Sequence, residues 1–558
     1  MPLKLNSKLL IGLAASLACA VTLSFAQDRT AFEQATVAAR EFNRTPAAVT
    51  PGAFEPSWES LKQYQTPEWF RDAKFGIWAH WGPQCEPEVG DWYAQHMYHS
   101  VNPKTGKPHP NYAYHVQHYG PPSQFGFKDV IHQWKAENWD PAKLMALYKR
   151  AGAKYFMAMA NHHDNLDLWA SRGQPWNATL VGPKKDLVGG WEKAARAEGL
   201  RFGVSVHAGR TWSWFEPAQG SDPDGPLKGV PYDGKLTAAD GRGQWWDGLD
   251  PQDLYAQNHA VGAPPDAAYC VKYFNRVEDL VSSYKPDLVY FDDGVLPLKN
   301  SPGDYGLKIV ADFYNRSAQW HDGRNEAVVN TKRLDETQRK CLVYDIERGK
   351  ADGILPDPWQ TDTCIGAWHY SRSIFNKHGY KKADDVVRML IDIVSKNGNL
   401  MLSIPVRGDG TIDSDEEAVL TRIADWMAVN SQAVFATRPW ATYGEGPSTA
   451  AKDAPKGAFG GVADVTPFTA EDVRYTRSKD GKTLFAFVMA RPESGRVTLK
   501  SLGADAKLLQ GSLGQVTLLG SSKPVTADQN AAGLTLSFDA ADPVLTDTPA
   551  CVFKIELK

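Results

Sequence analysis

The sequence has 558 residues, and its 61 Lys and Arg nearly balance its 65 Asp and Glu, which argues against a general nucleic-acid-binding protein. A hydrophobic share of 42% with 23% charged residues is typical of a globular protein, and this length predicts roughly two to four domains. The 19 Trp, 21 Tyr and 22 Phe are compatible with carbohydrate binding and equally with a large aromatic core.

The first 26 residues have the pattern of a secretory signal peptide. Two lysines precede an apolar run over Leu9–Phe25, and Ser24 and Ala26 supply the small residues that a signal peptidase requires. We therefore expect cleavage near Ala26 and a secreted or periplasmic mature protein. No later stretch approaches the roughly 20 apolar residues of a membrane span, so no membrane partner is expected after cleavage.

Five cysteines remain beyond this segment, and none of them forms a Cys-x-x-Cys pair. An odd and scattered set does not make a complete disulfide framework or a typical zinc site. One disulfide is compatible with this set, but the spacing does not identify its partners.

Residues 27–57 form a polar lead-in segment, and residues 58–440 alternate short apolar runs with amphipathic stretches. The apolar runs are too short for helices and predict buried parallel strands; they are Lys154–Ala160, Arg201–His207, Asp287–Phe291, Ala327–Asn330 and Asn399–Ile404. Helical patterns lie between them, at Pro141–Ala151, Glu192–Glu198, Val271–Tyr284 and Ala383–Ser395. This alternation predicts an α/β fold with a (β/α)8-like (TIM) barrel.

Three long segments, 82–127, 208–268 and 331–365, are predicted to be loops of this barrel, where such folds build their active sites. After residue 440 the pattern changes to short β-type runs between Gly, Asp and Ser turns. These runs are Thr483–Met489, Arg496–Leu499 and Thr535–Phe538. We therefore predict that residues 441–558 form a C-terminal antiparallel β-sandwich.

Imidazoles and carboxylates follow several of the predicted strands. His80 closes one strand, His162 and His163 close another, Asp292 closes a third, and Glu347 lies in the loop 331–365. The carboxyl ends of barrel strands meet at one mouth, so these groups are expected to share a pocket. Two carboxylates suit hydrolysis of a glycosidic bond, in which one attacks an oxocarbenium-like centre and the other protonates the leaving oxygen.

Five segments together resemble the α-L-fucosidases, glycoside hydrolase family 29. They are Trp69–Gly82, Asp91–Tyr93 with Met97 and Tyr98, Ala151–Phe156 leading to His162–Asp164 and to Leu168 and Trp169, Lys285–Asp292, and Val394–Leu400 through Asp409–Ile412. The resemblance covers about residues 58–440. It implies an exo-acting hydrolase of terminal α-L-fucosides in glycans or polysaccharides, with a covalent intermediate and a β-sandwich after the barrel. No cofactor and no metal are expected, because side chains meet both chemical roles.

The resemblance places the nucleophile on Asp292, while its neighbour Asp293 would point to the opposite face of the strand. The acid/base lies in a variable loop of the family, where Glu347 is the best match and Asp345 and Glu336 are competitors. For this role the pKa of Glu347 must be raised. A retaining mechanism would also place its carboxyl group about 5–5.5 Å from that of Asp292.

The resemblance further implies the residues that hold the sugar. Three histidines correspond to hydroxyl ligands, and three tryptophans are expected against the C6 methyl group of fucose; they are His80, His162 and His163, and Trp81, Trp92 and Trp368. A zinc site built from the histidines and Asp164 is the rival interpretation and would make the protein a metal-dependent hydrolase. It is disfavoured, because adjacent residues of a regular strand point to opposite faces.

The sequence departs from the family at several substrate contacts. Asp91 stands where glutamate is usual, and Lys332 stands where arginine is usual, with Arg333 beside it. The strand before His207 lacks a tyrosine pair, and we expect His207 and Arg210 to substitute for it. These changes keep three alternatives open: a sulfated fucan, a galactoside, or a sugar-binding protein without catalysis. The sequence carries no signal for an oligomeric state.

Overall fold

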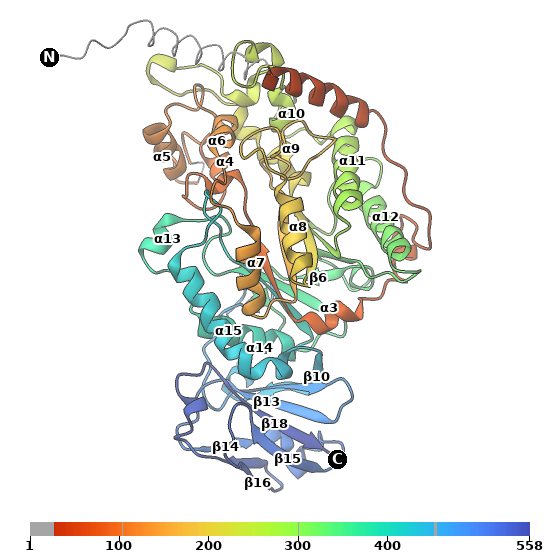
Figure 1. Ribbon diagram of the computed structural model, residues 1–558, viewed down its shortest axis with the longest axis vertical. Helices are drawn as coiled ribbons and strands as arrows, with labels where there is room; N and C mark the ends of the chain where they lie inside the picture. Colours follow the sequence, from red (N-terminus) through yellow and green to blue (C-terminus); the bar gives the residue numbers. More distant parts are fainter. Residues whose placement is uncertain (1–26, 103, 300, 451–454) are drawn as a thin grey trace, which may run out of the picture.

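Eight parallel strands close into a barrel in the computed structural model, which describes residues 27–102, 104–299, 301–450 and 455–558 (Figure 1). The strands are β1 (Phe75–Ala79), β2 (Tyr155–Asn161), β3 (Arg201–Val206), β4 (Leu288–Gly294), β5 (Val328–Lys332), β6 (Val343–Asp345), β8 (Trp359–Cys364) and β9 (Gly398–Ser403). Parallel pairing of β1 with β9, in which Phe75 lies opposite Leu400, closes the ring. The predicted barrel is confirmed, whereas the predicted signal peptide, residues 1–26, lies outside the described residues.

Helices cover the outside of the barrel, which is why its strands are buried on both faces (Figure 1). The larger helices are α7 (Pro141–Arg150), α8 (Leu187–Ala197), α11 (Ala267–Tyr284), α12 (Tyr305–Trp320), α14 (Ala383–Ser395) and α15 (Ser414–Val434). Aspartates begin several of them. Asp140, Asp186 and Asp266 each accept a hydrogen bond from a backbone N–H in the first turn of α7, α8 and α11.

The barrel is irregular between β5 and β8. No α-helix connects β5 to β6, and the connection from β6 to β8 holds only the two-residue strand β7 (Gly349–Lys350). The prediction of a loop over 331–365 is therefore wrong, because this segment contains two barrel strands. Strand β8 has the polar sequence WQTDTC, and its burial is possible because partners satisfy it: Gln360 donates to Asp345 Oδ2 at 2.7 Å.

The other two long connections carry short helices. They are α4 (Tyr93–His96), α5 (Pro110–His118) and α6 (Phe127–Gln133) in one, and α9 (Thr211–Trp214) and α10 (Pro251–Tyr255) in the other. Figure 1 shows them as a layer at one end of the long axis. The remaining short helices are α2 (Trp58–Leu61), α3 (Glu68–Ala73), α13 (Arg372–Asn376) and α16 (Pro447–Ala450). Among the residues that the structure describes, no helix combines the length and the apolar character needed to cross a membrane.

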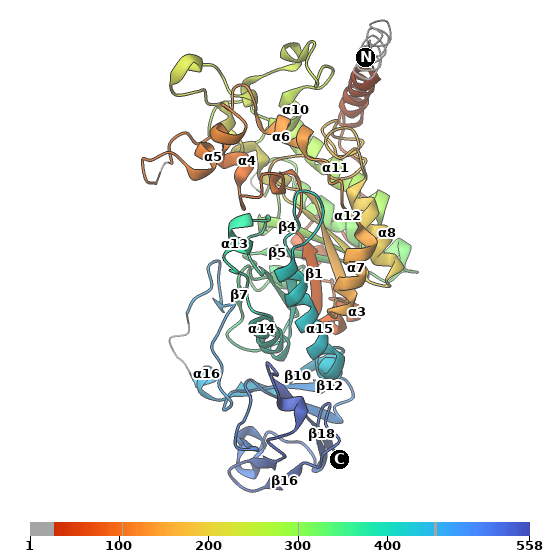
Figure 2. The same cartoon turned by 60° about the vertical axis from the view of Figure 1, so that its left-hand side comes forward.

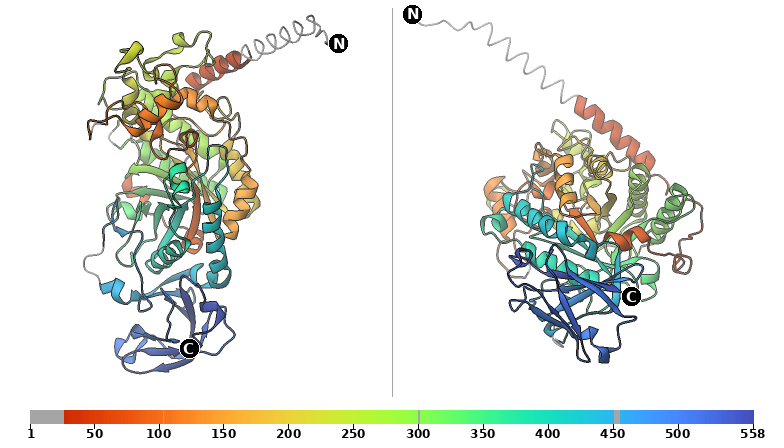
Figure 3. Two further views of the ribbon diagram at one scale, coloured as in Figure 1. Left: turned by 90° about the vertical axis from the view of Figure 1, so that its left-hand side faces the viewer. Right: turned by 60° about the horizontal axis from the view of Figure 1, so that its bottom comes forward.

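Two antiparallel sheets follow the barrel and lie at the opposite end of the long axis (Figure 3). One sheet has the order β10 (Thr437–Glu445), β12 (Val473–Ser478), β13 (Thr483–Val488), β18 (Cys551–Leu557), β15 (Leu513–Leu518). The other has the order β14 (Arg496–Leu499), β17 (Leu534–Ser537), β16 (Thr526–Gln529). Side chains of both sheets share one apolar core, which includes Leu499, Leu536 and Phe553. The predicted C-terminal β domain is confirmed, and its first strand begins at Thr437.

A buried ion cluster joins the barrel to these sheets. Asp392 of α14 pairs with Arg474 of β12 at 2.5 Å, and with Lys350 and Lys396 at 3.1 and 2.9 Å. Burial alone would raise the pKa of Asp392, but the three cations outweigh it and hold this pKa well below its ordinary value. The carboxylate is therefore ionised and shared by both parts of the chain.

Candidate active site

A pocket of about 860 Å³ opens at the carboxyl ends of the barrel strands, where the sequence predicts it. Nearly all of the predicted site residues line it: His80, Asp91, Trp92, His162, His163, His207, Asp292, Lys332, Glu347 and Trp368. These side chains come from the ends of six strands and from two loops. The fold therefore gathers residues that are almost 290 positions apart in the sequence, as His80 and Trp368 are.

Trp81 is the predicted site residue that the structure does not bring to the pocket. Its side chain is buried in an aromatic cluster with Trp134, Trp139 and Trp191, and its indole N–H donates to the carbonyl of Arg407 at 2.8 Å. His80 occupies the inward position at the end of β1, so the next residue points away from the pocket. Trp81 packs the barrel instead of contacting a ligand.

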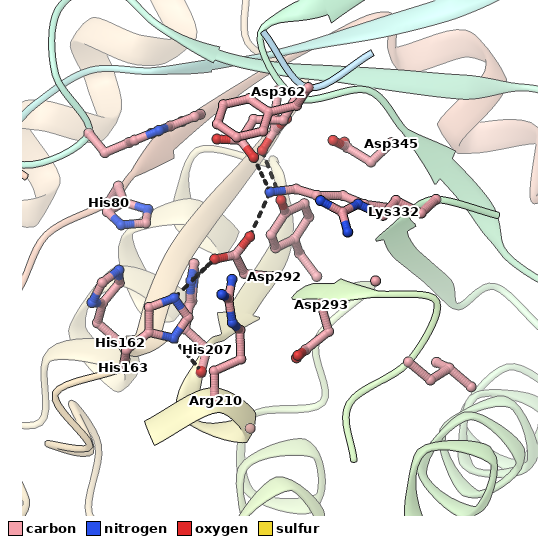
Figure 4. A pocket seen from close by; sticks show the side chains of 18 of the residues that line it. His80, His162, His163, His207, Arg210, Asp292, Asp293, Lys332, Asp345 and Asp362 are labelled. Atoms are coloured by element: carbon pink, nitrogen blue, oxygen red, sulfur yellow. Dashed lines mark hydrogen bonds and ion pairs between the residues drawn. The ribbon is translucent and has the colours of Figure 1, made fainter. Parts of the chain in front are cut away.

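Asp292 lies at the end of β4 in a ring of cationic and imidazole groups (Figure 4). Its Oδ1 is 2.6 Å from Lys332 Nζ, and its Oδ2 is 3.2 Å from His163 Nε2 and 3.4 Å from His207 Nδ1. Burial alone would raise the pKa of Asp292, but Lys332 and the two imidazoles hold it well below its ordinary value. The carboxylate is therefore ionised over the whole neutral range.

Asp293 also lines the pocket, but its carboxyl group points away from Lys332 (Figure 4). Burial, and next the charge of Asp292, raise the pKa of Asp293 to about 6. Its Oδ2 has no hydrogen-bond partner among the described residues. Of these two neighbouring carboxyl groups, Asp292 has the lowered pKa and Asp293 the raised one.

Glu347 lies two residues beyond the end of β6 and contacts Lys332 Nζ through its Oε2. Burial raises the pKa of Glu347 to about 7; Lys332 opposes this shift, while Asp362 and Asp292 add to it. A carboxyl group with this pKa holds a proton in a large fraction of molecules at neutral pH. The two carboxyl groups therefore differ in protonation although they share one lysine.

Lys332 limits the distance between one oxygen of Asp292 and one oxygen of Glu347. It is the last residue of β5, and its ammonium nitrogen contacts an oxygen of Asp292 and an oxygen of Glu347. Two N–H···O contacts placed end to end span at most about 6 Å, so the two oxygens lie within that distance. The pKa of Lys332 is raised, since burial is outweighed by the surrounding carboxylates, and the lysine remains charged.

The competing acid/base candidates have different surroundings. Glu336 is exposed and does not line the pocket. Asp345 is buried at the end of β6, and burial together with the charge of Asp362 raises its pKa well above the ordinary value. Tyr290 donates to Asp362 Oδ2 at 2.9 Å. Asp362 therefore belongs to the buried polar side chains near Glu347. Its position inside β8 could not be predicted from the sequence.

Five histidines form one wall of the pocket, and His369 is the member that the sequence did not single out. The ring of His369 lies 4.7 Å from that of His80 and 4.8 Å from that of His162, measured between centroids. Its backbone N–H donates to Asp91 Oδ1 at 2.7 Å. Burial, followed by the neighbouring histidines, lowers the pKa values of His80 and His162, so these two rings are neutral at neutral pH.

His162 and His163 both face the pocket, contrary to the expectation that adjacent histidines point to opposite faces. Strand β2 ends at Asn161, so the regular alternation stops before them. Two triads have ligand atoms within 4.8 Å of one another; they are His80, His162 and His369, and His162, His163 and His207. Imidazole nitrogens this close together could hold a borderline metal such as Zn²⁺, although catalysis by carboxylates requires none.

Three aromatic residues that line the pocket come from loops: Trp92, Trp368 and Phe459. Trp92 has a left-handed backbone with φ of 64°, a conformation that bulky residues adopt only where the surroundings enforce it. Trp368 lies beneath the guanidinium of Arg348, 5.1 Å from its ring centroid. Phe459 reaches the rim from the segment that follows the barrel, which sequence analysis could not predict.

The sequence is similar to those of known α-L-fucosidases. A family model described as "Alpha-L-fucosidase" matches residues 42–432, and one described as "Alpha-L-fucosidase C-terminal domain" matches residues 466–556. Tissue alpha-L-fucosidase of Mus musculus is 27% identical over 466 residues, which cover 81% of this chain and 84% of the mouse protein. Plasma alpha-L-fucosidase of Homo sapiens is 27% identical over 490 residues, 86% and 87% of the two chains.

Solved structures agree on the fold. The alpha-fucosidase of Thermotoga maritima in complex with fucose superimposes with a TM-score of 0.64 at 24% identity, covering 90% of this chain and 100% of that chain. An alpha-L-fucosidase isoenzyme from Paenibacillus thiaminolyticus gives a TM-score of 0.58 at 20% identity, covering 90% and 99%. With a family model spanning most of the barrel and a second one over the C-terminal sheets, this chain belongs to the α-L-fucosidase family and is a glycoside hydrolase of that class.

Proposed function

We propose that the protein is an exported, retaining exo-glycosidase that removes terminal α-L-fucose from glycans or polysaccharides through a covalent glycosyl-enzyme intermediate. The contact of one ammonium group with both Asp292 and Glu347 is the observation that carries this proposal. Retaining enzymes hold their carboxyl groups about 5–5.5 Å apart, whereas inverting enzymes need about 6.5–9.5 Å to admit a water molecule. The shared lysine supports the shorter separation.

In the first step, ionised Asp292 attacks the anomeric carbon and forms an ester bond to fucose. The glycosidic bond breaks at the same time, and Glu347 gives its proton to the leaving oxygen. The depressed pKa of Asp292 and the pKa of about 7 of Glu347 match these roles. In the second step, Glu347 takes a proton from water, whose oxygen attacks the anomeric carbon and releases the Asp292 carboxylate.

Lys332 serves both steps because the negative charge changes place between its two partners. Before the reaction Asp292 carries the charge, and in the intermediate Glu347 carries it, since the ester of Asp292 is neutral. One ammonium group in contact with both oxygens stabilises either arrangement without moving. Loss of the charge on Asp292 also lowers the pKa of Glu347, because a like charge no longer disfavours its anion.

The histidine wall is proposed to hold the sugar hydroxyl groups. A neutral imidazole offers one donor and one acceptor, which suits a ring of hydroxyls that both donate and accept. His80 Nδ1 and His369 Nε2 have no hydrogen-bond partner among the described residues, while His369 Nδ1 lies 3.5 Å from Asp91 Oδ1. Buried polar atoms without partners in a pocket are available to a polar ligand.

Hydrolysis of an aryl α-L-fucoside by the wild type and by Asp292→Ala tests this proposal. We expect wild-type turnover and a loss of about 10³-fold or more in the variant, partly restored by azide, which replaces the missing nucleophile. Asp293→Asn is the matched control and should retain most of the activity. Activity that survives in Asp292→Ala would refute the assigned nucleophile. A wild type that is silent on fucosides but active on galactosides would refute the substrate.

Export is proposed from the sequence alone. Lysines, an apolar run and small residues before Gln27 form a signal-peptide pattern. Expression of the full chain in a bacterium, followed by mass measurement of the periplasmic protein, should give a mature form that begins near Gln27. An uncleaved chain in the cytoplasm would contradict the proposal.

A sulfated fucoside is the second candidate substrate. Arg210 and Arg333 line the pocket, and neither has an ion-pair partner within 4.0 Å in the described part of the chain. Unpaired guanidinium groups at a pocket suit sulfate esters, which they bind through two parallel hydrogen bonds. Equal kcat/KM values for plain and sulfated fucosides would remove this candidate.

A further inference from the structure

Phe459 is unusual because it is an aromatic side chain that is both largely exposed and part of the pocket. The exposed large apolar side chains of the described residues include two aromatics, Trp92 at 38% and Phe459 at 56% exposure, and both line the pocket. Exposed aromatic surface at a binding site is a common sign of a ligand that covers it.

Phe459 sits on a short hairpin between the barrel and the C-terminal sheets. Gly457 N–H donates to Gly461 O at 3.0 Å, and strand β11 (Val462–Ala463) pairs antiparallel with β7. Figure 2 shows this segment rising from the C-terminal sheets along the barrel beside β7. Since β7 begins two residues after Glu347, this ladder sets the position of Phe459 relative to the acid/base.

Glycines bring the two backbones into direct contact. A Cβ atom on Gly349 would lie 2.2 Å from Gly460 O, and one on Gly461 would lie 2.2 Å from Lys350 O. A Cβ atom on Gly457 would lie 3.0 Å from Gly349 Cα. Side chains at these positions would push the hairpin off the barrel, so the glycines fix its height above the pocket.

Polar contacts hold the hairpin from the other side. Asp464 accepts a hydrogen bond from Thr363 Oγ1 at 2.7 Å and pairs with Lys381 at 3.0 Å. Lys350 Nζ donates to Thr466 Oγ1 at 2.9 Å. The hairpin is therefore anchored on β8, on β7 and on the segment before α14, and Phe459 is presented by a supported turn.

We propose that Phe459 is the platform of a leaving-group subsite, on which the apolar face of the sugar bonded to fucose stacks. The inference rests on the proposed fucosidase function and names the other half of its substrate. The acid/base must touch the glycosidic oxygen, so the leaving sugar has to emerge on the side of Glu347. Phe459 occupies the rim of the same pocket, and its hairpin is paired with the strand next to Glu347.

Arg348 completes this subsite. It follows Glu347 directly, lines the pocket, and has no carboxylate partner within 4.0 Å in the described residues. Its guanidinium lies over Trp368 and donates one hydrogen bond to Cys364 Sγ at 2.9 Å, and its remaining N–H groups can donate to sugar hydroxyls. The subsite thus fits a neutral pyranose with one apolar face and polar edges.

The test compares two substrates that share fucose and differ in the leaving group. α-L-Fucosyl fluoride leaves a single atom, and a fucosyl disaccharide with galactose leaves a whole ring. In Phe459→Ala, kcat/KM for the disaccharide should fall about tenfold relative to kcat/KM for the fluoride. Phe459→Trp should restore the wild-type ratio. Val465→Ala is the matched control, because Val465 is exposed on the same segment but does not line the pocket.

Each outcome decides between the two claims. An unchanged ratio in Phe459→Ala, or an equal loss on both substrates, overturns the platform while the fucosidase function stands. A wild type that does not hydrolyse the fluoride refutes the fucosidase function, and the subsite falls with it. Thermal unfolding of each variant checks that the fold is retained, which is expected for an exposed side chain.

Discussion

Replacement of Lys332 by methionine removes a positive charge that touches both Asp292 and Glu347, while keeping most of the side-chain volume. The ammonium nitrogen is 2.6 Å from Asp292 Oδ1 and also contacts Glu347. Both carboxylates lose their attraction to this cation, so the pKa values of both groups should rise. The imidazoles of His163 and His207 remain beside Asp292 and preserve part of its acidity.

The size of the effect follows from the proximity of the charge. An opposite charge at this range lowers the pKa of an aspartate by about 1–3 units, which equals about 1.4–4 kcal/mol of differential stabilisation. In the wild type, kcat/KM should stay high to pH values below 3.8, the ordinary pKa of an aspartate, because Asp292 is still ionised there. In Lys332→Met, the acid limb of the kcat/KM profile should move to higher pH by about 1–3 units.

The assay is the pH dependence of kcat/KM for an aryl α-L-fucoside in both proteins, because this quantity reports the ionisations of the free enzyme. Lys308→Met is the matched control: Lys308 lies over the ring of Tyr305 on α12 and does not line the pocket. An acid limb that stays in place in Lys332→Met would refute the assigned role of the lysine. A shift to lower pH would refute the sign of the electrostatics.

Three further outcomes are expected. In the wild type, kcat/KM should fall as pH rises through about 7, because Glu347 loses its proton there, and Glu347→Gln should lack this basic limb. Asp392→Asn should lower the free energy of unfolding by about 3–5 kcal/mol in denaturant titrations, since three buried cations lose their anion. Zn²⁺ should inhibit competitively through the histidine triads, and EDTA should reverse the inhibition in kinetic assays.

For each of these three outcomes, one result would contradict the reasoning. If the basic limb persists in Glu347→Gln, the ionisation that causes this limb belongs to another group. Asp539→Asn, which breaks the exposed pair with Lys523, should leave stability unchanged, and an equal loss in both variants would contradict the buried cluster. Inhibition by Zn²⁺ that is not weakened in His369→Ala would exclude the triad of His80, His162 and His369.

The parts of the fold that follow local rules could be predicted from the sequence. Strands β2, β3, β4 and β9 are continuous apolar runs, and the observed elements begin within two residues of the predicted ones. His80, His162 and Asp292 were identified because residues at strand ends meet at one barrel mouth whatever the loops do. The amphipathic pattern of Ala383–Ser395 gave α14 with its observed bounds, since one face packs on the barrel.

The remainder depends on partners that are distant in the sequence. Strand β8 buries Gln360 and Asp362, which form hydrogen bonds with Asp345 and Tyr290, and no local pattern reveals such pairing. His369 and Phe459 enter the pocket from loops whose course is set by tertiary contacts. Trp81 was expected to line the pocket, but its side chain points away from it. The direction of a residue just beyond a strand depends on where the strand ends.

Closure of the barrel has a consequence for how the protein folds. Strand β1 finds its second neighbour in β9, more than 300 residues later, so the first strand stays an open edge until nearly the whole barrel has been synthesised. Contacts between residues so far apart in the sequence slow folding and leave partly folded intermediates prone to aggregation. A truncated chain that ends before β9 would contain Asp292 and Glu347, the proposed catalytic residues, but could not close the barrel whose strand ends position them.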